Sequence, residues 1–177
     1  LWIVGFMIFV LWKLTGGSDE VVLGPGIKAH EAPMQQEIKQ AEPFEFKGHK
    51  ITPLADFALQ AKVLAKENYH LGQESELSPV DLALGWGEMS DQAIIDKIQF
   101  SQSGRWYRWS VETFPIPRRA IETQSANMHM VPSEDHIMDK LDIVKEGQVI
   151  ALKGFLIRVD ANAVSYTHLT LPTTPYV

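Results

Sequence analysis

The chain opens with an unbroken apolar run. Residues 1–12 carry no charged side chain, and Lys13 ends the run. A run without a polar face favours a membrane element over a surface helix. As a helix it spans ~18 Å, whereas a bilayer core needs about 20 residues, so we expect missing residues upstream. We predict a transmembrane helix over 1–14, incomplete at its N-terminal end. A cleaved signal peptide and a buried helix of a soluble domain are the alternatives.

The next segment has the composition of a linker. Residues 15–42 are dominated by Gly, Pro, Gln and charged side chains, and their only apolar run is Val21–Leu23. Such a composition is typical of a connection rather than of a packed element. We therefore expect a globular domain over residues 43–163, joined to the membrane by this linker.

Apolar and polar residues alternate near the start of that domain. The apolar positions are Phe57, Leu59, Ala61 and Val63, and the polar positions are Asp56, Gln60 and Lys62. A two-residue period predicts a strand. A helix with Leu54, Phe57, Ala61 and Leu64 on one face is the competing interpretation.

Helix signals follow at three places. Ser78 before Pro79 predicts a short helix that Gly85 and Gly87 end. Ser90 predicts the start of a second helix, and Ser133 that of a third, which buries Ile137, Leu141 and Val144. We expect these helices to be short insertions between strands.

The remaining segments predict strands. A turn at Ser103–Gly104 precedes an aromatic strand, and residues 146–160 form a long strand with a bulge or bend at Gly154. The predicted fold class is therefore α+β: a transmembrane helix, then a small β-rich domain with short inserted helices. A partly open, OB-like barrel is one form of such a domain.

The last residues differ from the rest of the chain. Residues 164–177 lack the charge spacing and the apolar alternation seen upstream. One codon choice for residues 164–174 reproduces a transposase-end and adapter sequence used in library preparation. We expect this tail to be non-native read-through, and the domain to be truncated at its C-terminal end.

The net charge and the absence of cysteine exclude several classes of partner and site. The formal net charge of -6 argues against a nucleic-acid partner, because such proteins neutralise phosphates with Lys and Arg. The absence of Cys excludes a disulfide framework, a thiolate zinc site and a cysteine nucleophile. No motif in the sequence indicates a bound cofactor or a metal site.

Aromatic residues are the first candidates for ligand binding. Trp86 lies between two glycines. It could cover the core as a lid or offer a surface on which a ligand stacks. The alternative is a plain core residue. Trp106 and Arg108 share one face of the aromatic strand, where a sugar, a peptide or a base could stack. Ordinary packing of both faces is the alternative for this strand.

His129 is the main candidate for chemistry. It lies near Asn127, and it could pair with Asp81 or Asp91 as a metal ligand or an acid–base group. The spacing matches no established metal or catalytic motif. A buried histidine bonded to a backbone carbonyl is the alternative.

Four strings carry a family resemblance. They are ITPLADFALQAKVL, LSPVDLALGWGEMSD, SQSGRWYRW and SANMHMVP. Together they resemble an uncharacterised bacterial family of small single-pass membrane-anchored proteins, over about residues 50–160. The resemblance implies an anchored globular domain and assigns no catalytic residue.

We therefore predict a membrane-tethered binding or assembly module. Residues 1–14 would contact the lipid bilayer, and the domain would lie outside the cytoplasm, with another envelope protein as the expected partner. The alternative is a metal-assisted hydrolase that uses His129 with Asp81 or Asp91.

Overall fold

Strands make up most of the ordered secondary structure. The computed structural model describes residues 20–160 and 165–172. The strands are β1 Met34–Glu37, β2 Phe44–Phe46, β3 His49–Asn68, β4 Val80–Gly85, β5 Gln99–Ser103, β6 Trp106–Ser110, β7 Ser125–Met130, β8 Val149–Asp160 and β9 Ser165–Pro172. The helices are α2 Gln73–Leu77, the 3-10 turn η1 Gly87–Ser90, α3 Gln92–Ile95, α4 Arg118–Thr123 and α5 Asp135–Ile143.

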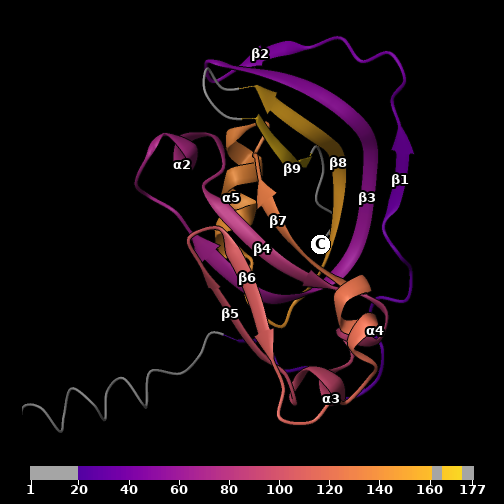
Figure 1. The fold of residues 1–177 in the computed structure, drawn as a ribbon. Coiled ribbons are helices and arrows are strands. Elements are labelled where there is room, and N and C mark those ends of the chain that lie inside the picture. Colours follow the sequence, from indigo (N-terminus) through magenta and orange to yellow (C-terminus); the bar gives the residue numbers. More distant parts are fainter. Residues whose placement is uncertain (1–19, 161–164, 173–177) are drawn as a thin grey trace, which may run out of the picture.

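Five strands form a closed ring. The order is β3-β4-β7-β9-β8, and β8 pairs again with β3 (Figure 1). Neighbouring strands are antiparallel except β7 and β9, which are parallel. The short strands β1 and β2 add to the edge of β3 that does not face β8. The hairpin β5–β6 forms a separate two-stranded sheet.

Strand β3 bends enough to pair on both sides of the ring. Its register with β8 shifts between Pro53 and Ala55, and its register with β4 shifts between Val63 and Ala65. An extra residue in one strand bends that strand and increases its twist. The two shifts let β3 pair along β8 and then with β4. The bulge expected at Gly154 is absent, since Gly154 pairs with Phe57 in continuous register.

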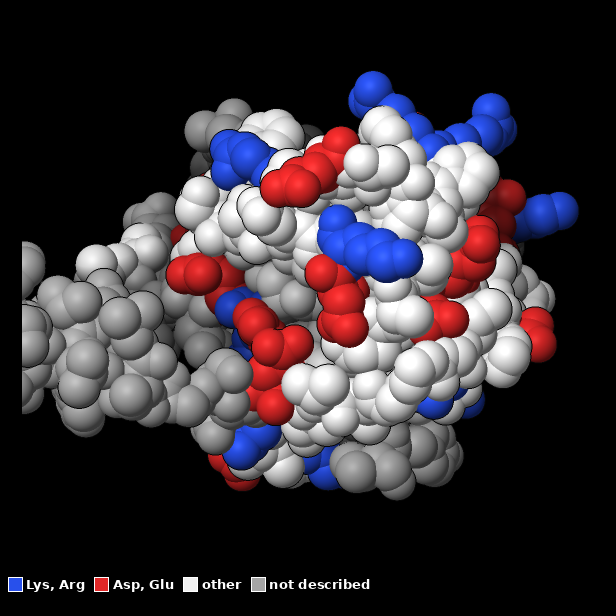
Figure 2. Space-filling model, turned by 90° about the horizontal axis from the view of Figure 1, so that it is seen from below, with Lys and Arg blue, Asp and Glu red and all other residues white. Residues whose placement is uncertain are grey.

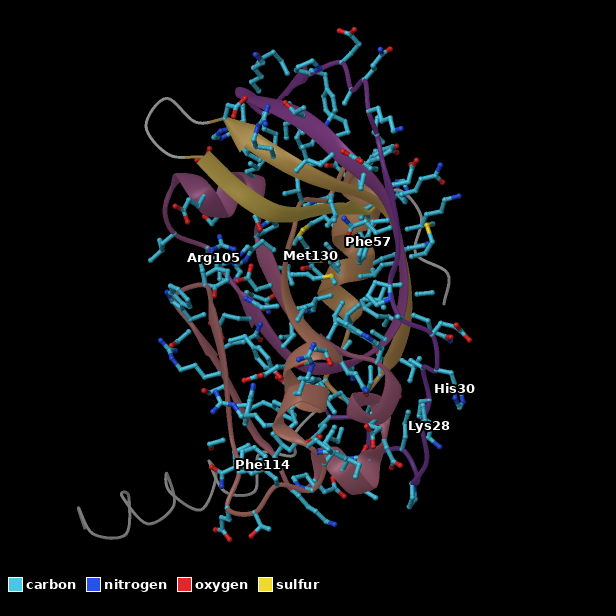
Figure 3. The ribbon with its side chains drawn as sticks, turned by 45° about the vertical axis from the view of Figure 1, so that its right-hand side comes forward. Lys28, His30, Phe57, Arg105, Phe114 and Met130 are labelled. Atoms are coloured by element: carbon cyan, nitrogen blue, oxygen red, sulfur yellow. The ribbon has the colours of Figure 1, made fainter. Side chains whose placement is uncertain are left out.

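The inside of the ring is the main hydrophobic core. Its buried residues include Phe57, Leu82, Leu84, Met128, Met130 and Leu152. Helix α5 adds Ile137 and Leu141 to this core. Figure 3 shows Phe57 and Met130 within the ring and Arg105 outside it, at the tip of the hairpin.

The predicted fold class is wrong in its helical part. No helix in residues 20–160 or 165–172 exceeds nine residues, and strands dominate. Within those ranges, no helix has both the length and the apolar character needed to cross a bilayer. The span predicted over 1–14 lies outside the described residues. The structure therefore corrects the α+β class to a mostly β fold, because the described residues bury their apolar side chains in a ring of strands, and it shows no membrane-spanning helix within those residues.

The helix predicted from Ser78 and Pro79 is also wrong. Residues Val80–Gly85 form β4, and all six are buried. Leu82 and Leu84 face the ring interior, whereas Asp81 and Ala83 face the hairpin. A strand covered on both faces is apolar throughout, so it lacks the alternation that marks a half-buried strand.

Other local predictions are confirmed. The alternating segment is a strand, β3, and the aromatic segment forms β6 after a turn at Gly104. The third helix is confirmed as α5, although Glu134 rather than Ser133 occupies its N-cap position.

Two segments predicted to lie outside the domain contribute to the sheet. In the predicted linker, Ala29 is fully buried, the Val21 amide donates to the Glu146 carbonyl at 2.8 Å, and β1 pairs with β3. In the tail, Ser165–Pro172 forms β9 between β7 and β8. The read-through origin of residues 164–177 stays a prediction about the gene.

Candidate functional site

The β5–β6 hairpin lies across the outer face of β4 and β7. Its inner side chains Phe100, Tyr107 and Trp109 pack against a second buried cluster, which includes Ala83 of β4. The Phe100 and Tyr107 rings are stacked with centroids 6.1 Å apart. The Gln102 amide donates to the Asn127 side-chain oxygen on β7 at 2.6 Å. The hairpin therefore has a buried inner face and an exposed outer face.

A two-residue turn closes the hairpin. Gly104 has a φ of 56° and Arg105 a φ of 70°. Two successive left-handed residues match the twist of the flanking strands, which is why such turns favour glycine. Arginine in this conformation costs roughly 1 kcal/mol. The contacts of the Arg105 side chain offset this cost.

Arg105 fixes the hairpin tip to the barrel. Its guanidinium donates to Asp81 Oδ1 at 2.7 Å and to the Ser78 carbonyl at 2.7 Å. The same group lies 3.8 Å from the ring centroid of Tyr69, which is a cation–π contact. The Asp81 side chain is fully buried, so Arg105 supplies the counter-charge that a buried carboxylate requires.

Of the two carboxylates proposed for His129, Asp81 lies beside it. His129 and Asp81 are cross-strand partners on β7 and β4. His129 Nδ1 lies 2.9 Å from Asp81 Oδ1, but the two groups are not aligned for a hydrogen bond. Asp81 Oδ2 also has no hydrogen-bond partner among the described residues. The carboxylate instead pairs with Arg105, whose positive charge opposes binding of a cation at the same oxygen.

The other predicted metal ligand lies elsewhere. Asp91 caps α3 by accepting from the Ala93 amide at 2.9 Å, and it also accepts from the Gly26 amide. In the part of the chain that the structure describes, no three His, Asp or Glu side chains are grouped to hold a metal ion. The geometry required for the metal-assisted hydrolase is therefore not assembled by these residues.

Two further candidates lie in packed positions. Trp86 is 9% exposed and packs in the main core with Ala29, so it presents no open stacking surface. Asn127 lies under the hairpin, where it accepts from Gln102 and donates to the Arg105 carbonyl at 3.3 Å. Trp86 is therefore a core residue, and Asn127 holds the hairpin on β7.

Trp106 and Arg108 lie on the exposed outer face, as the alternation predicted. Trp106 is 68% exposed, and the Arg108 guanidinium lies 3.4 Å from Ser103 Oγ on the adjacent strand. An exposed tryptophan beside an arginine on a flat two-stranded sheet can stack on a ligand.

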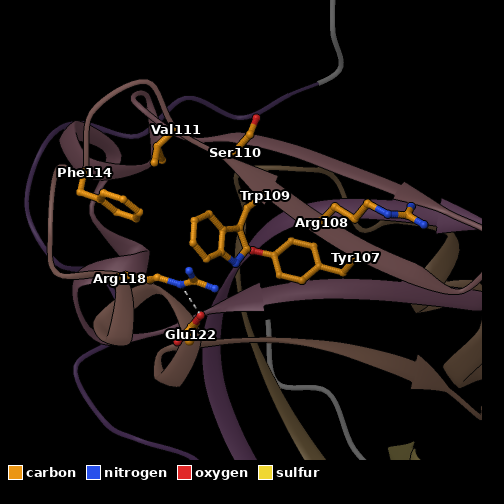
Figure 4. A pocket seen from close by; sticks show the side chains of 8 residues that line it. All are labelled: Tyr107, Arg108, Trp109, Ser110, Val111, Phe114, Arg118 and Glu122. Atoms are coloured by element: carbon orange, nitrogen blue, oxygen red, sulfur yellow. Dashed lines mark hydrogen bonds and ion pairs between the residues drawn. The ribbon is translucent and has the colours of Figure 1, made fainter.

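A shallow groove runs along β6. Residues Tyr107–Val111 form one wall, and Phe114, Arg118 and Glu122 form the other, around a volume of roughly 650 Å³. Figure 4 shows that Trp109, Phe114 and Arg118 point toward one another, while Arg108 points away from the centre of the groove. The Trp109 and Phe114 rings meet edge to face at 6.3 Å. The groove thus combines an aromatic floor with charged walls.

The charge of the groove differs in sign from that of the whole chain. Two arginines and one glutamate line it, and Arg118 pairs with Glu122 at 2.8 Å. The chain as a whole carries a formal charge of -6. On the face seen in Figure 2, at the α3 and α4 end, acidic and basic side chains are interspersed, with no continuous basic patch among the coloured residues. Within the groove, the Arg118–Glu122 pair leaves Arg108 as the surplus positive charge.

Burial also shifts the pKa of titratable groups near the hairpin and on β3, among them Tyr107 and Lys62. Burial raises the pKa of Tyr107 to about 12, although its contact with Ser125 partly opposes the shift. Burial lowers the pKa of Lys62, against the attraction of Asp96. Both shifts follow from the cost of placing a charge away from water.

Sequence reasoning missed Arg105 and the burial of Lys62. Arg105 directly follows the predicted turn, but no pattern indicated that its side chain folds back onto Asp81. Lys62 falls on the polar side of β3, yet it is fully buried and bonded to Gln92 of α3. Only the tertiary packing of the hairpin and α3 determines both positions.

No family model, curated protein or solved structure matches this chain at a significant level. The function is therefore argued from the geometry of the hairpin and its groove.

Proposed function

We propose that the chain is a binding module whose recognition surface is the groove along β6. The observation that carries this proposal is the open aromatic groove formed by Trp109 and Phe114, with Arg118 beside the two rings and Arg108 on the outer face of β6. Phe114 is 51% exposed, although burying such a side chain is favourable. An aromatic groove with a few polar groups at its walls is typical of a ligand site.

The rigid attachment of the hairpin supports the same function. Arg105 ties its tip to Asp81 and Ser78, and Gln102 ties its middle to Asn127. A recognition surface held in place by such contacts loses little entropy on binding. The groove is thus preorganised by residues that do not line it.

A screen of three ligand classes tests the proposal. The probes are a library of octapeptides, a set of neutral and acidic oligosaccharides, and an oligothymidylate, each titrated against the full chain. We expect one class to bind, and we expect Arg118→Glu to weaken that binding by about tenfold because it reverses a charge on the groove wall.

Arg119→Glu is the matched control. Arg119 is also exposed on α4 but does not line the groove, so its reversal changes the net charge equally. We expect it to leave binding unchanged. Equal effects of the two variants, or no binding by any class, would overturn the proposal.

A further inference from the structure

One wall of the groove is the edge of a strand. In the part of the chain described by the structure, β6 pairs with β5 alone, and the two form their own sheet. A strand with one unpaired edge presents free backbone N–H and C=O groups that another strand can pair with. The groove therefore offers backbone as well as side-chain contacts.

The register identifies the backbone groups at this edge. Ser103 pairs with Trp106 across the two-residue turn, so the hydrogen-bonded pairs alternate from there. Trp106 and Arg108 direct their backbone groups toward β5. Tyr107 and Trp109 consequently direct theirs toward the groove. No backbone hydrogen bond in the described residues joins Tyr107 or Trp109 to a strand other than β5.

The opposite wall fixes the width of the groove. Arg118 and Glu122 of α4 and Phe114 of the preceding loop face the β6 edge. An added strand lies about 4.8 Å from its neighbour, so a chain paired with the β6 edge would lie between that edge and α4. Binding by strand addition uses this arrangement.

We infer that the groove binds an extended acidic peptide segment, which adds to the free edge of β6. This inference rests on the proposed function and names its ligand class. Side chains on the inner side of the added strand would contact Trp109 and Phe114, so apolar residues fit there. Those on the outer side share a face with Arg108, so acidic residues fit there.

Charge complementarity favours a peptide with acidic side chains over a basic one. Arg118 pairs with Glu122, so Arg108 supplies the surplus positive charge beside the β6 edge. Alternation of the peptide side chains places every second residue on the side of Arg108. An acidic oligosaccharide could pair with the arginines, but its hydroxyls lack the regular spacing of N–H and C=O groups that matches a strand edge.

The test uses a labelled octapeptide of alternating Val and Glu, titrated against the full chain by fluorescence anisotropy. We expect it to bind, and we expect a peptide of alternating Val and Lys to bind at least about tenfold more weakly. Arg118→Glu should weaken binding of the acidic peptide, and Arg119→Glu should leave that binding unchanged.

Backbone methylation separates strand addition from side-chain binding. Successive residues of a strand direct their N–H groups to opposite edges. N-methylation of the Val residues removes the donors facing β6 in an antiparallel pairing, and N-methylation of the Glu residues does so in a parallel one. We expect one of the two methylated peptides to lose binding while the other retains it.

Three results would overturn the inference. Equal binding of both methylated peptides would exclude strand addition. Binding of an acidic oligosaccharide, but of no peptide, would reject the peptide while leaving the proposed binding module intact. If Arg118→Glu changed the binding of none of the probes, both the peptide inference and the proposed binding module would be rejected.

Discussion

Single residues decide how the hairpin is held. The left-handed backbone of Arg105 costs conformational free energy. The contacts of its side chain with Asp81, Ser78 and Tyr69 offset that cost. Residue types suggested His129 with either Asp81 or Asp91, and the pairing of β7 with β4 is what places His129 beside Asp81. The ion pair between Arg105 and Asp81 was not predictable, because the turn that brings Arg105 to Asp81 belongs to a different sheet.

Removing Arg105 should destabilise the fold. Arg105→Ala leaves Asp81 buried without its counter-charge, and we expect a loss of about 3 kcal/mol in the free energy of unfolding. Arg119→Ala, on the surface of α4, should cost less than about 0.5 kcal/mol. Urea unfolding of the three proteins measures both values.

A double variant identifies the cause of that loss. Adding Asp81→Asn to Arg105→Ala removes the buried charge, so it should restore part of the stability. A double variant that is less stable than Arg105→Ala alone would contradict the role given to the ion pair.

Tyr107 should make the fold sensitive to alkaline pH. Its pKa is raised to about 12 in the fold, from 10.0, so above pH 10 the unfolded chain loses the proton first. Stability contributed by the neutral phenol is therefore present below pH 10 and is lost as the pH rises toward 12. Relative to Tyr107→Phe, the wild type should lose about 2 to 3 kcal/mol over this range. Unfolding of both proteins at pH 9 and pH 12 checks this; a constant difference contradicts it.

At the scale of elements, covered faces limited what the sequence could predict. Strand β3 was predictable because its apolar positions alternate, whereas β4 was mistaken for a helix because both of its faces are buried. The groove was not predictable, since α4 and β6 meet only through folding of the loop between them. The common face of Trp106 and Arg108 did follow from alternation, but its exposure did not.

Gly85 shows how tightly β4 joins the following turn. A Cβ at this position would overlap the carbonyl oxygen of Met89, whereas one at Gly24 would meet nothing within 4 Å. Gly85→Ala should therefore lower the unfolding free energy by more than about 1 kcal/mol. Gly24→Ala should change it little, and thermal unfolding of the two variants tests the contrast. Equal melting temperatures would contradict the close packing of η1 on β4.

At the scale of the whole molecule, the barrel serves as a rigid support for one open surface. The ring of strands buries the core, and Arg105 and Gln102 attach the hairpin to its outer face. The net charge of the chain follows from its sequence alone. The surplus of arginine over glutamate in the groove could not be predicted from the sequence. Residues from β6, a loop and α4 create it together.

The most direct test of the binding module is the location of the bound ligand. Backbone amide shifts of the full chain should be followed by NMR while the Val and Glu octapeptide is added. We predict that the largest changes fall on Tyr107, Trp109, Phe114 and Arg118, along the groove. Saturable binding with its largest changes on the opposite side of the barrel, around β1 and β2, would contradict the account.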